Sequence, residues 1–173
     1  MGKNVKDRPE DAAKPESVDD GSKSFSPIPS LSARPEKSER VANAEATIRK
    51  MTEDFPIWAL EDIDKLDAHL RDAEPTSGNG KTTLAEAFKI VHDMRGQGGS
   101  FGYPLITRIS GSFCRFLESV EDVTPQVLAI SNAHAKALRT VLENRISGNG
   151  GEMGDKIATG LEKAAAKYLE NQQ

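Results

Sequence analysis

The sequence predicts an all-α protein: an antiparallel four-helix bundle with an additional helix at the C-terminus and a disordered N-terminal tail. Three observations predict it. From Glu39 onward, apolar residues recur at the three- and four-residue intervals of one helix face. No segment shows the strict alternation of a half-buried strand. Most connections between the helical segments are short, which makes consecutive helices antiparallel neighbours.

The tail is expected to comprise residues 1–38, and the helical bundle residues 39–173. Residues 1–40 contain five of the nine prolines, eight basic and eight acidic residues, and almost no large apolar side chains. Such a segment cannot bury enough apolar surface to offset the entropy lost on ordering. We therefore expect it to be disordered.

Composition excludes several classes of protein. The formal net charge is -4, so an electrostatic footprint for nucleic acid is not expected. No run approaches the roughly 20 apolar residues of a membrane span, and no apolar leader begins the chain. The single cysteine, Cys114, falls in an apolar helical run and is expected to be a buried thiol. We expect a cytoplasmic protein with no nucleic-acid or membrane partner, and the sequence leaves its oligomeric state open.

Two helices are expected before residue 75. The first follows an apolar face formed by Val41, Ala44, Ile48 and Met51, and Pro56 interrupts it. Asp54 is expected to cap a new helix, with Pro56 in its first turn. That helix presents an apolar side formed by Trp58, Ile63, Leu66 and Leu70.

After a loop at 75–80, a helix over about 81–96 is expected to carry the motif discussed below. The next helix begins near Tyr103-Pro104, and another begins at Thr124-Pro125, with threonine as N-cap and proline at the first helical position. A last helix covers about 152–170 after a glycine-rich turn. The expected core positions of these helices are Leu84, Ala87, Phe88, Val91, Met94; Leu105, Ile106, Ile109, Phe113, Phe116, Leu117, Val120; Val127, Ile130, Ala137, Leu138, Val141, Leu142; and Ile157, Leu161, Ala164, Tyr168.

A stretch from Ser77 to Leu84 resembles a phosphate-binding P-loop, but nucleotide binding is disfavoured. Pro75 stands where the pattern requires its first glycine, and a charged helix rather than a buried strand is expected to precede the loop. Metal binding is also not expected, because no pair of histidine or cysteine residues has ligand spacing on a helix. His69 is expected to be solvated, and His134 to be a hydrogen-bonded histidine in the core.

His92 is different because of what surrounds it, and it is expected to point outward, about a quarter-turn from buried Val91. A neutral imidazole can attack phosphorus, and Arg95 and Lys89, one turn to either side, can neutralise the phosphoryl group. Glycine at position 96 costs about 1 kcal/mol of helix propensity relative to alanine and would leave space for an approaching protein. The alternative interpretation is that Gly96 simply ends the helix and His92 is an ordinary surface residue.

The spacing around His92 resembles the signature of histidine-containing phosphotransfer (HPt) domains. The matching positions are His92, Arg95, Gly96, Gly99, Ser100, Phe101 and Gly102, followed by apolar Leu105 and Ile106. By helix order the resemblance covers roughly residues 40–146, and it is sharp over 88–106. The sequence departs from the pattern in having arginine at 95 for the usual lysine and in having Asp93 beside the histidine.

The resemblance implies an HPt-like bundle in which His92 is the phosphoacceptor and Arg95 stabilises the phosphoryl group. Phe88, Lys89, Gly96 and Gly99 would form the docking surface. The partners would be the receiver domains of a hybrid histidine kinase and of response regulators. No cofactor is implied, because the magnesium belongs to the receiver, and the protein would be a phosphocarrier without kinase activity. A helical adaptor that binds receivers or other proteins without transferring phosphate is the alternative.

Overall fold

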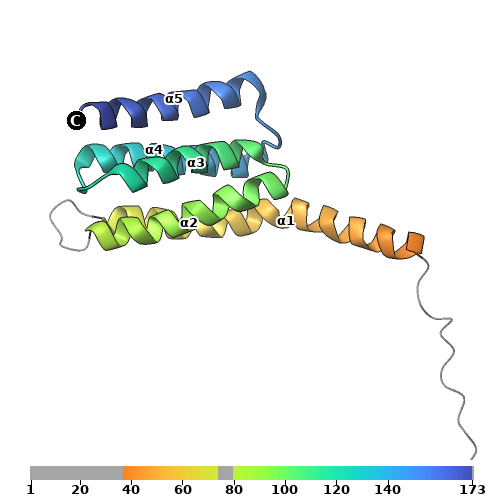
Figure 1. The fold of residues 1–173 in the computed structure, drawn as a ribbon. Helices are drawn as coiled ribbons and strands as arrows, with labels where there is room; N and C mark the ends of the chain where they lie inside the picture. Colours follow the sequence, from red (N-terminus) through yellow and green to blue (C-terminus); the bar gives the residue numbers. More distant parts are fainter. Residues whose placement is uncertain (1–36, 74–79, 173) are drawn as a thin grey trace, which may run out of the picture. The chain divides into compact units, whose positions relative to one another are not determined.

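The computed structural model describes residues 37–73 and 80–172, and within them the chain is all-helical. Five helices follow one another: α1 (Lys37–Asp72), α2 (Gly80–Ser100), α3 (Pro104–Ser119), α4 (Pro125–Glu143) and α5 (Gly151–Glu170) (Figure 1). The predicted fold class is thus confirmed at the level of an all-α protein. The predicted tail, apart from its last two residues, and the predicted loop at 75–80, apart from Gly80, lie outside the described residues.

The packing of the helices places α3 at the centre. It contacts α2, α4 and α5, while α1 contacts α2 and α4. Helix α5 lies on the side of α3 and α4 that faces away from α1 and α2 (Figure 1). The helix that bears His92, α2, is therefore held between α1 and α3.

The apolar faces predicted for α2, α3 and α4 form most of the core. Leu84, Ala87, Val91 and Met94 of α2 are buried, as are the predicted residues of α3 except Val120, which is half-buried. Helix α5 differs from the prediction. Ala164 is exposed, and the residues that α5 buries are the small Gly154, Ala158 and Ala165. Small residues allow α5 to lie close to its neighbours without a wide apolar stripe.

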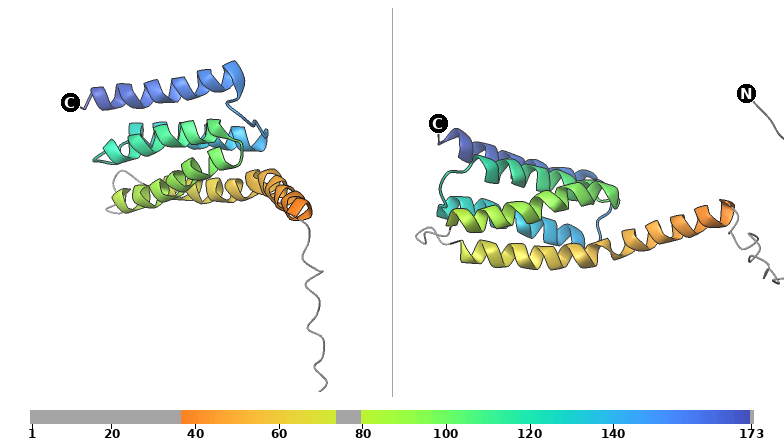
Figure 2. Two further views of the ribbon diagram at one scale, coloured as in Figure 1. Left: turned by 45° about the vertical axis from the view of Figure 1, so that its right-hand side comes forward. Right: turned by 60° about the horizontal axis from the view of Figure 1, so that its bottom comes forward.

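Helix α1 is continuous through Pro56, so the predicted break and the predicted Asp54 cap are wrong. A proline inside a helix removes one hydrogen bond, crowds the preceding turn and bends the axis. Figure 2 shows that the axis of α1 changes direction along its length. Burial of Phe55 and Pro56 stabilises this turn, and Arg145 Nη1 donates to the Glu53 carbonyl at 3.3 Å. A partner from the loop after α4 thus supplies a hydrogen bond beside the proline.

The starts of α3 and α4 agree with the sequence. Pro104 occupies the first turn of α3, and Tyr103 precedes it. At α4 the Thr124 hydroxyl accepts a hydrogen bond from the Val127 N–H at 3.1 Å, with Pro125 in the first turn. These are local signals that act within one turn, which is why they could be read from the sequence.

Two arginines tie the outer helices to the central ones. Arg139 of α4 bonds Asp64 and Asp67 of α1 at 2.6 and 2.8 Å. Arg108 of α3 bonds Glu162 at 2.9 Å and Asp155 at 2.6 Å, both on α5. Each planar guanidinium engages two carboxylates at once, which fixes the register of the helix pair more than a single exposed ion pair would.

The predicted core residues His134 and Cys114 are both buried. The ring of His134 stacks on Phe113 with ring centroids 4.9 Å apart. Its Nδ1 lies 2.9 Å from the Ile130 carbonyl, and its Nε2 lies 3.3 Å from the Ser112 hydroxyl. Burial lowers the pKa of His134, because the protonated ring is poorly solvated there. Burial likewise raises the pKa of the Cys114 thiol.

The free energy of unfolding should fall as the pH drops below about 6.5, the pKa of a histidine in an unfolded chain. Since the folded-state pKa is lowered, the unfolded state takes up the proton first and is favoured as acid is added. Urea unfolding of the wild type at pH 7.5 and pH 5.5 would measure the decrease. His134→Phe, which keeps a flat ring between the same neighbours, should show a smaller decrease. An equal decrease in the variant would contradict the assignment of the pH dependence to His134.

Candidate functional site

His92 lies two-thirds of the way along α2 and points away from the core. Its neighbour Val91 is fully buried, whereas 59% of the His92 side chain is exposed. The helical rotation of 100° per residue separates the two side chains in this way. The structure therefore presents the imidazole to solvent, as the sequence predicted.

The imidazole stands between two shallow hollows. On the side toward the start of α2 its ring lies 5.8 Å from the ring of Phe88, one turn back, at 35°. Phe88, Lys89, Asp93, Arg95 and, from α3, Glu118 line this first hollow with His92. On the other side, the second hollow is lined by His92, Asp93, Gly96, Gln97, Ser100 and Phe101.

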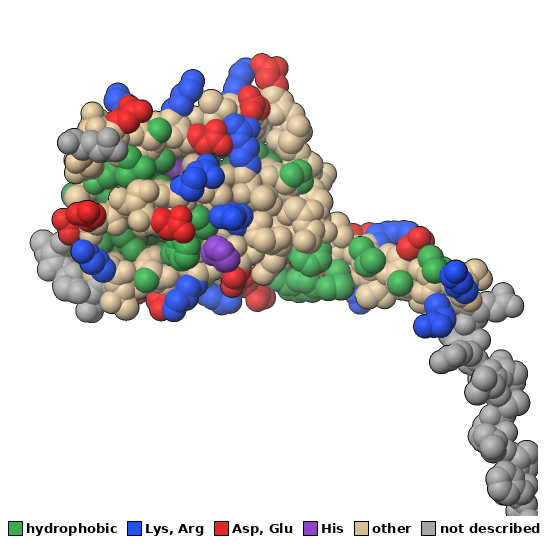
Figure 3. Space-filling view, viewed as in Figure 1, with side chains coloured by type: hydrophobic (Ala, Val, Ile, Leu, Met, Phe, Trp, Pro, Cys, Tyr) green, Lys and Arg blue, Asp and Glu red, His purple; other side chains and the backbone are tan. Residues whose placement is uncertain are grey.

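The first hollow adjoins a more apolar groove between α2 and α3. Phe88 and Glu118 line both of them. The remaining lining of the groove is Lys81, Leu84, Ala85, Leu117, Val120 and Glu121. Figure 3 shows hydrophobic side chains at the surface between α2 and α3. An exposed histidine thus lies at the end of an apolar groove.

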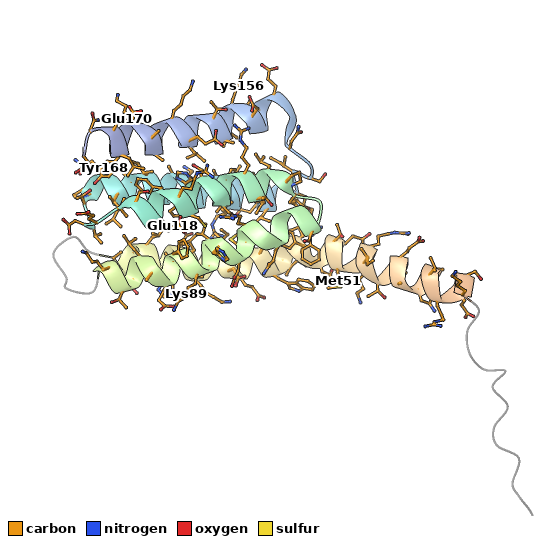
Figure 4. The ribbon with its side chains drawn as sticks, viewed as in Figure 1. Met51, Lys89, Glu118, Lys156, Tyr168 and Glu170 are labelled. Atoms are coloured by element: carbon orange, nitrogen blue, oxygen red, sulfur yellow. The ribbon has the colours of Figure 1, made fainter. Side chains whose placement is uncertain are left out.

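Two carboxylates flank the imidazole. The Asp93 Oδ1 atom lies 3.8 Å from His92 Nδ1, which is too long for a hydrogen bond. Glu118, from α3, lines the first hollow together with His92. Figure 4 labels it between the two helices, with Lys89 on the far edge of α2. No local pattern in the sequence associates Glu118 with His92, because their proximity depends on how α3 packs on α2.

The two predicted cations lie in different settings. Lys89 Nζ is paired with Glu86 Oε1 at 2.7 Å, and this hydrogen bond lowers the pKa of Glu86. The side chain of Arg95 leans over α3, where its Cδ lies 3.7 Å from the place that a Cβ at Gly111 would take. Its charge opposes the effect of burial on the Cys114 thiol. The Arg95 stem is thereby packed on α3, whereas Lys89 is held by its own helix.

The glycines after His92 have different surroundings. Gly96 is exposed, and a Cβ built there meets nothing within 4 Å. Gly99 is exposed but is not among the residues that line the two hollows, and its Cβ would lie 3.5 Å from Thr107 Oγ1. Of the six predicted site residues, the structure therefore gathers His92, Phe88, Lys89, Arg95 and Gly96 around the hollows and leaves Gly99 beside them.

Gly96 does not end the helix, so the alternative interpretation of a helix terminus there is wrong. Helix α2 continues to Ser100, beyond the predicted end near 96. The reason lies in Gly98, which the sequence analysis did not single out. A Cβ on Gly98 would come within 2.9 Å of Thr107 Oγ1 and 3.0 Å of the Tyr103 carbonyl oxygen. Gly98 permits α3 to approach the last turn of α2, and that contact holds the turn in helical form.

The sequence disfavours nucleotide binding at the P-loop-like stretch and does not predict a metal site. Lys81, the lysine of the P-loop-like stretch, is exposed and lies 3.9 Å from Asp122. The segment before that stretch is helix α1 rather than a strand. Within residues 37–73 and 80–172 no group of three or more potential metal ligands is found. None of the helices described has the length and apolar character needed to cross a membrane.

Comparisons with protein-family models, with curated proteins and with solved structures find no match to this chain. Its function is therefore argued from the site alone.

Gly98→Ala and Gly96→Ala should have opposite effects on stability. The alanine at 98 must push α3 away and should lower the free energy of unfolding by about 1–3 kcal/mol. The alanine at 96 enters open space within a helix and should raise the free energy by about 1 kcal/mol. Urea unfolding followed by circular dichroism measures both variants. Equal effects of the two alanines would contradict the close approach at Gly98.

Proposed function

We propose that this chain is a histidine phosphotransfer protein, which accepts a phosphoryl group on His92 from a receiver-domain aspartate and passes it to another receiver. The observation that carries the proposal is the pairing of an exposed imidazole with open space at Gly96, one turn further on the same helix. A receiver must bring its own aspartate to within bonding distance of the ring. Any side chain at 96 would stand between the two surfaces.

The proposed nucleophile is the Nε2 atom of His92. Asp93 Oδ1 lies 3.8 Å from Nδ1, and we assign the lone pair that attacks phosphorus to Nε2. In the transfer, Nε2 forms a bond to phosphorus as the bond from phosphorus to the aspartate oxygen breaks. Nδ1 keeps its proton, and the Asp93 carboxylate balances the positive charge that the ring acquires. Arg95, which lines the same hollow as His92, would neutralise the phosphoryl oxygens.

The groove beside the site suits a protein partner. Phe88 connects the His92 hollow to the apolar groove lined by Leu84, Leu117 and Val120. Phe101 extends the apolar surface on the other side, past Gly96. Apolar surface on both sides of a reactive residue supplies binding energy without occupying the reacting position. Phe88, Lys89, Gly96 and Gly99 remain the proposed docking residues, with Gly99 at the margin.

The helix contacts support an HPt-like arrangement of α1 to α4. The pairs α1–α2, α2–α3, α3–α4 and α4–α1 form a closed ring of neighbours, which is the contact pattern of a four-helix bundle. Helix α5 packs outside this ring against α3 and α4. We propose the same antiparallel bundle for this chain, with α5 as an addition. The relay would work in the cytoplasm, with magnesium supplied by the receivers and with no kinase activity in the chain itself.

Wild type and His92→Ala should differ completely when mixed with a receiver domain that carries radiolabelled phosphate on its aspartate, with magnesium present. Label should appear on the wild type in an acid-labile, base-stable form, as a phosphohistidine requires, and not on the variant. His69→Ala, a change at a half-buried histidine of α1, should retain labelling. Labelling of His92→Ala would show that another residue is the acceptor.

Gly96→Trp should abolish transfer while leaving the helical circular dichroism unchanged, because the indole would fill the space above α2. Gly160→Trp is the matched control, since Gly160 is also an exposed helical glycine whose Cβ would meet nothing within 4 Å. It should transfer at the wild-type rate. Full transfer by Gly96→Trp would rule out docking over this face.

A non-transferring adaptor is favoured by one observation. Two carboxylates, Asp93 and Glu118, flank the ring, and Lys89 is engaged by Glu86. An anionic phosphoryl group would meet repulsion there. The adaptor predicts that receivers bind the wild type and His92→Ala equally and that neither takes label. Transfer to Asp93→Asn and Glu118→Gln measures how much the carboxylates oppose phosphorylation.

A further inference from the structure

The N-terminal part of α1 carries an apolar stripe that nothing in the described chain covers. Every residue from 37 to 51 is exposed. The large apolar side chains among them are 50% (Val41), 62% (Ile48) and 41% (Met51) exposed. Hydrophobic side chains line this part of the helix in Figure 3, and Figure 4 labels Met51 where α1 emerges from beside α2.

The stripe has the spacing of a coiled-coil seam. Val41, Ala44, Ile48 and Met51 are separated by three, four and three positions, and Phe55 and Trp58 continue the same alternation. In heptad terms these residues occupy the a and d positions. Phe55 is fully buried, so the stripe runs without a break from the exposed part of α1 into the core. The exposed residues thus extend an existing packing seam.

The rest of this segment argues against a lipid surface as the occupant. Between residues 37 and 54 the four basic residues (Lys37, Arg40, Arg49, Lys50) are balanced by four acidic ones (Glu39, Glu45, Glu53, Asp54). Helices that lie on anionic membranes carry an excess of lysine and arginine on their polar face. A segment of zero net charge with alternating signs is typical of the outer face of a coiled coil.

Stability also requires a partner for this segment. The exposed part is about four turns long, and isolated helices of this length are marginal in water. Most helical stability comes from packing an apolar face. The stripe is therefore expected to be covered when the helix is formed.

We propose that the stripe pairs with the same stripe of a second copy of this chain, as a short parallel coiled coil in register. The residues that flank the seam favour this occupant. Arg40 falls at position g and Glu45 at position e, so each Arg40 faces the Glu45 of the other copy and the dimer gains two ion pairs. The next g and e positions are Thr47 and Thr52, which are neutral. In an antiparallel pairing centred on the stripe, the two Glu45 side chains would instead face each other.

This proposal concerns association and goes beyond the phosphotransfer proposed for His92. His92→Ala should dimerise as the wild type does, and a dimer that fails to form leaves the phosphotransfer assay unaffected. The two proposals can therefore fail separately.

Sedimentation equilibrium of the full chain, from tens to hundreds of micromolar, tests the association. Two heptads give a weak dimer, so the average mass should rise with concentration toward twice that of the monomer. Ile48→Glu places a charge in the seam and should weaken the dimer by at least about tenfold, which corresponds to 1.4 kcal/mol. Ala46→Glu adds the same charge at an exposed position off the seam and should have little effect. Both substituted side chains are exposed in the monomer, so circular dichroism should show that the fold is kept.

The arrangement of the two helices has its own test. Ala44→Cys places a thiol at a d position, where two copies meet in a parallel, in-register pair, and mild oxidation should cross-link it. Ala46→Cys, on the outer face, should not cross-link, and the buried Cys114 does not compete. Glu45→Arg should weaken the dimer, and Arg40→Glu combined with Glu45→Arg should restore it.

Several results would overturn the proposal. A chain that stays monomeric at hundreds of micromolar has no such dimer. An Ile48→Glu variant that dimerises like the wild type does so through another surface. A dimer that Ala44→Cys does not cross-link is not parallel and in register. A monomeric chain whose binding to a receiver is lost in Ile48→Glu would assign the stripe to that partner instead.

Discussion

The close approach of α3 to α2 at Gly98 is the contact on which the candidate site depends. The Tyr103 N–H donates to the Gly98 carbonyl at 2.7 Å, and the Thr107 hydroxyl donates to the Arg95 carbonyl at 3.1 Å. No side chain fits between the two backbones at this point. These bonds hold the glycine-rich end of α2 in helical form, although glycine disfavours a helix. Gly96 consequently lies on a helix surface beside His92 and does not form a frayed terminus.

The chemistry of the His92 surface is set by two helices. Helix α2 supplies the imidazole, Asp93 and the open position at Gly96, while α3 supplies Glu118 and the surface on which Arg95 packs. The result is a ring with cationic and anionic neighbours close together. The cationic neighbours would favour a phosphoryl group on the ring, and the anionic neighbours would oppose it. How strongly Asp93 and Glu118 oppose a phosphoryl group on His92 therefore distinguishes the proposed relay from the proposed adaptor.

Ion pairs fix the helices on either side of α2 and α3. Arg139 joins α4 to α1, and Arg108 joins α3 to α5. With α1 tied to α4 and α3 tied to α5, α2 is held between two positioned helices. The N-terminal part of α1 takes no part in this framework, which is why its apolar stripe is free for an intermolecular contact.

The sequence by itself determined the helical class, the apolar faces of α2, α3 and α4, the N-cap at Thr124 and the proline in the first turn of α3, Pro104. It also determined the outward direction of His92. These features depend on residues within a turn or two of each other, so periodicity and local hydrogen bonding reveal them. Only the tertiary structure decided that α1 passes through Pro56, since Arg145, which bonds Glu53, lies 92 positions further along the chain. It likewise decided the helical course past Gly96, the approach of Glu118 to His92, and the exposure of the Val41–Met51 stripe. Each of these depends on which distant segments pack together, and no local pattern of residues carries that information.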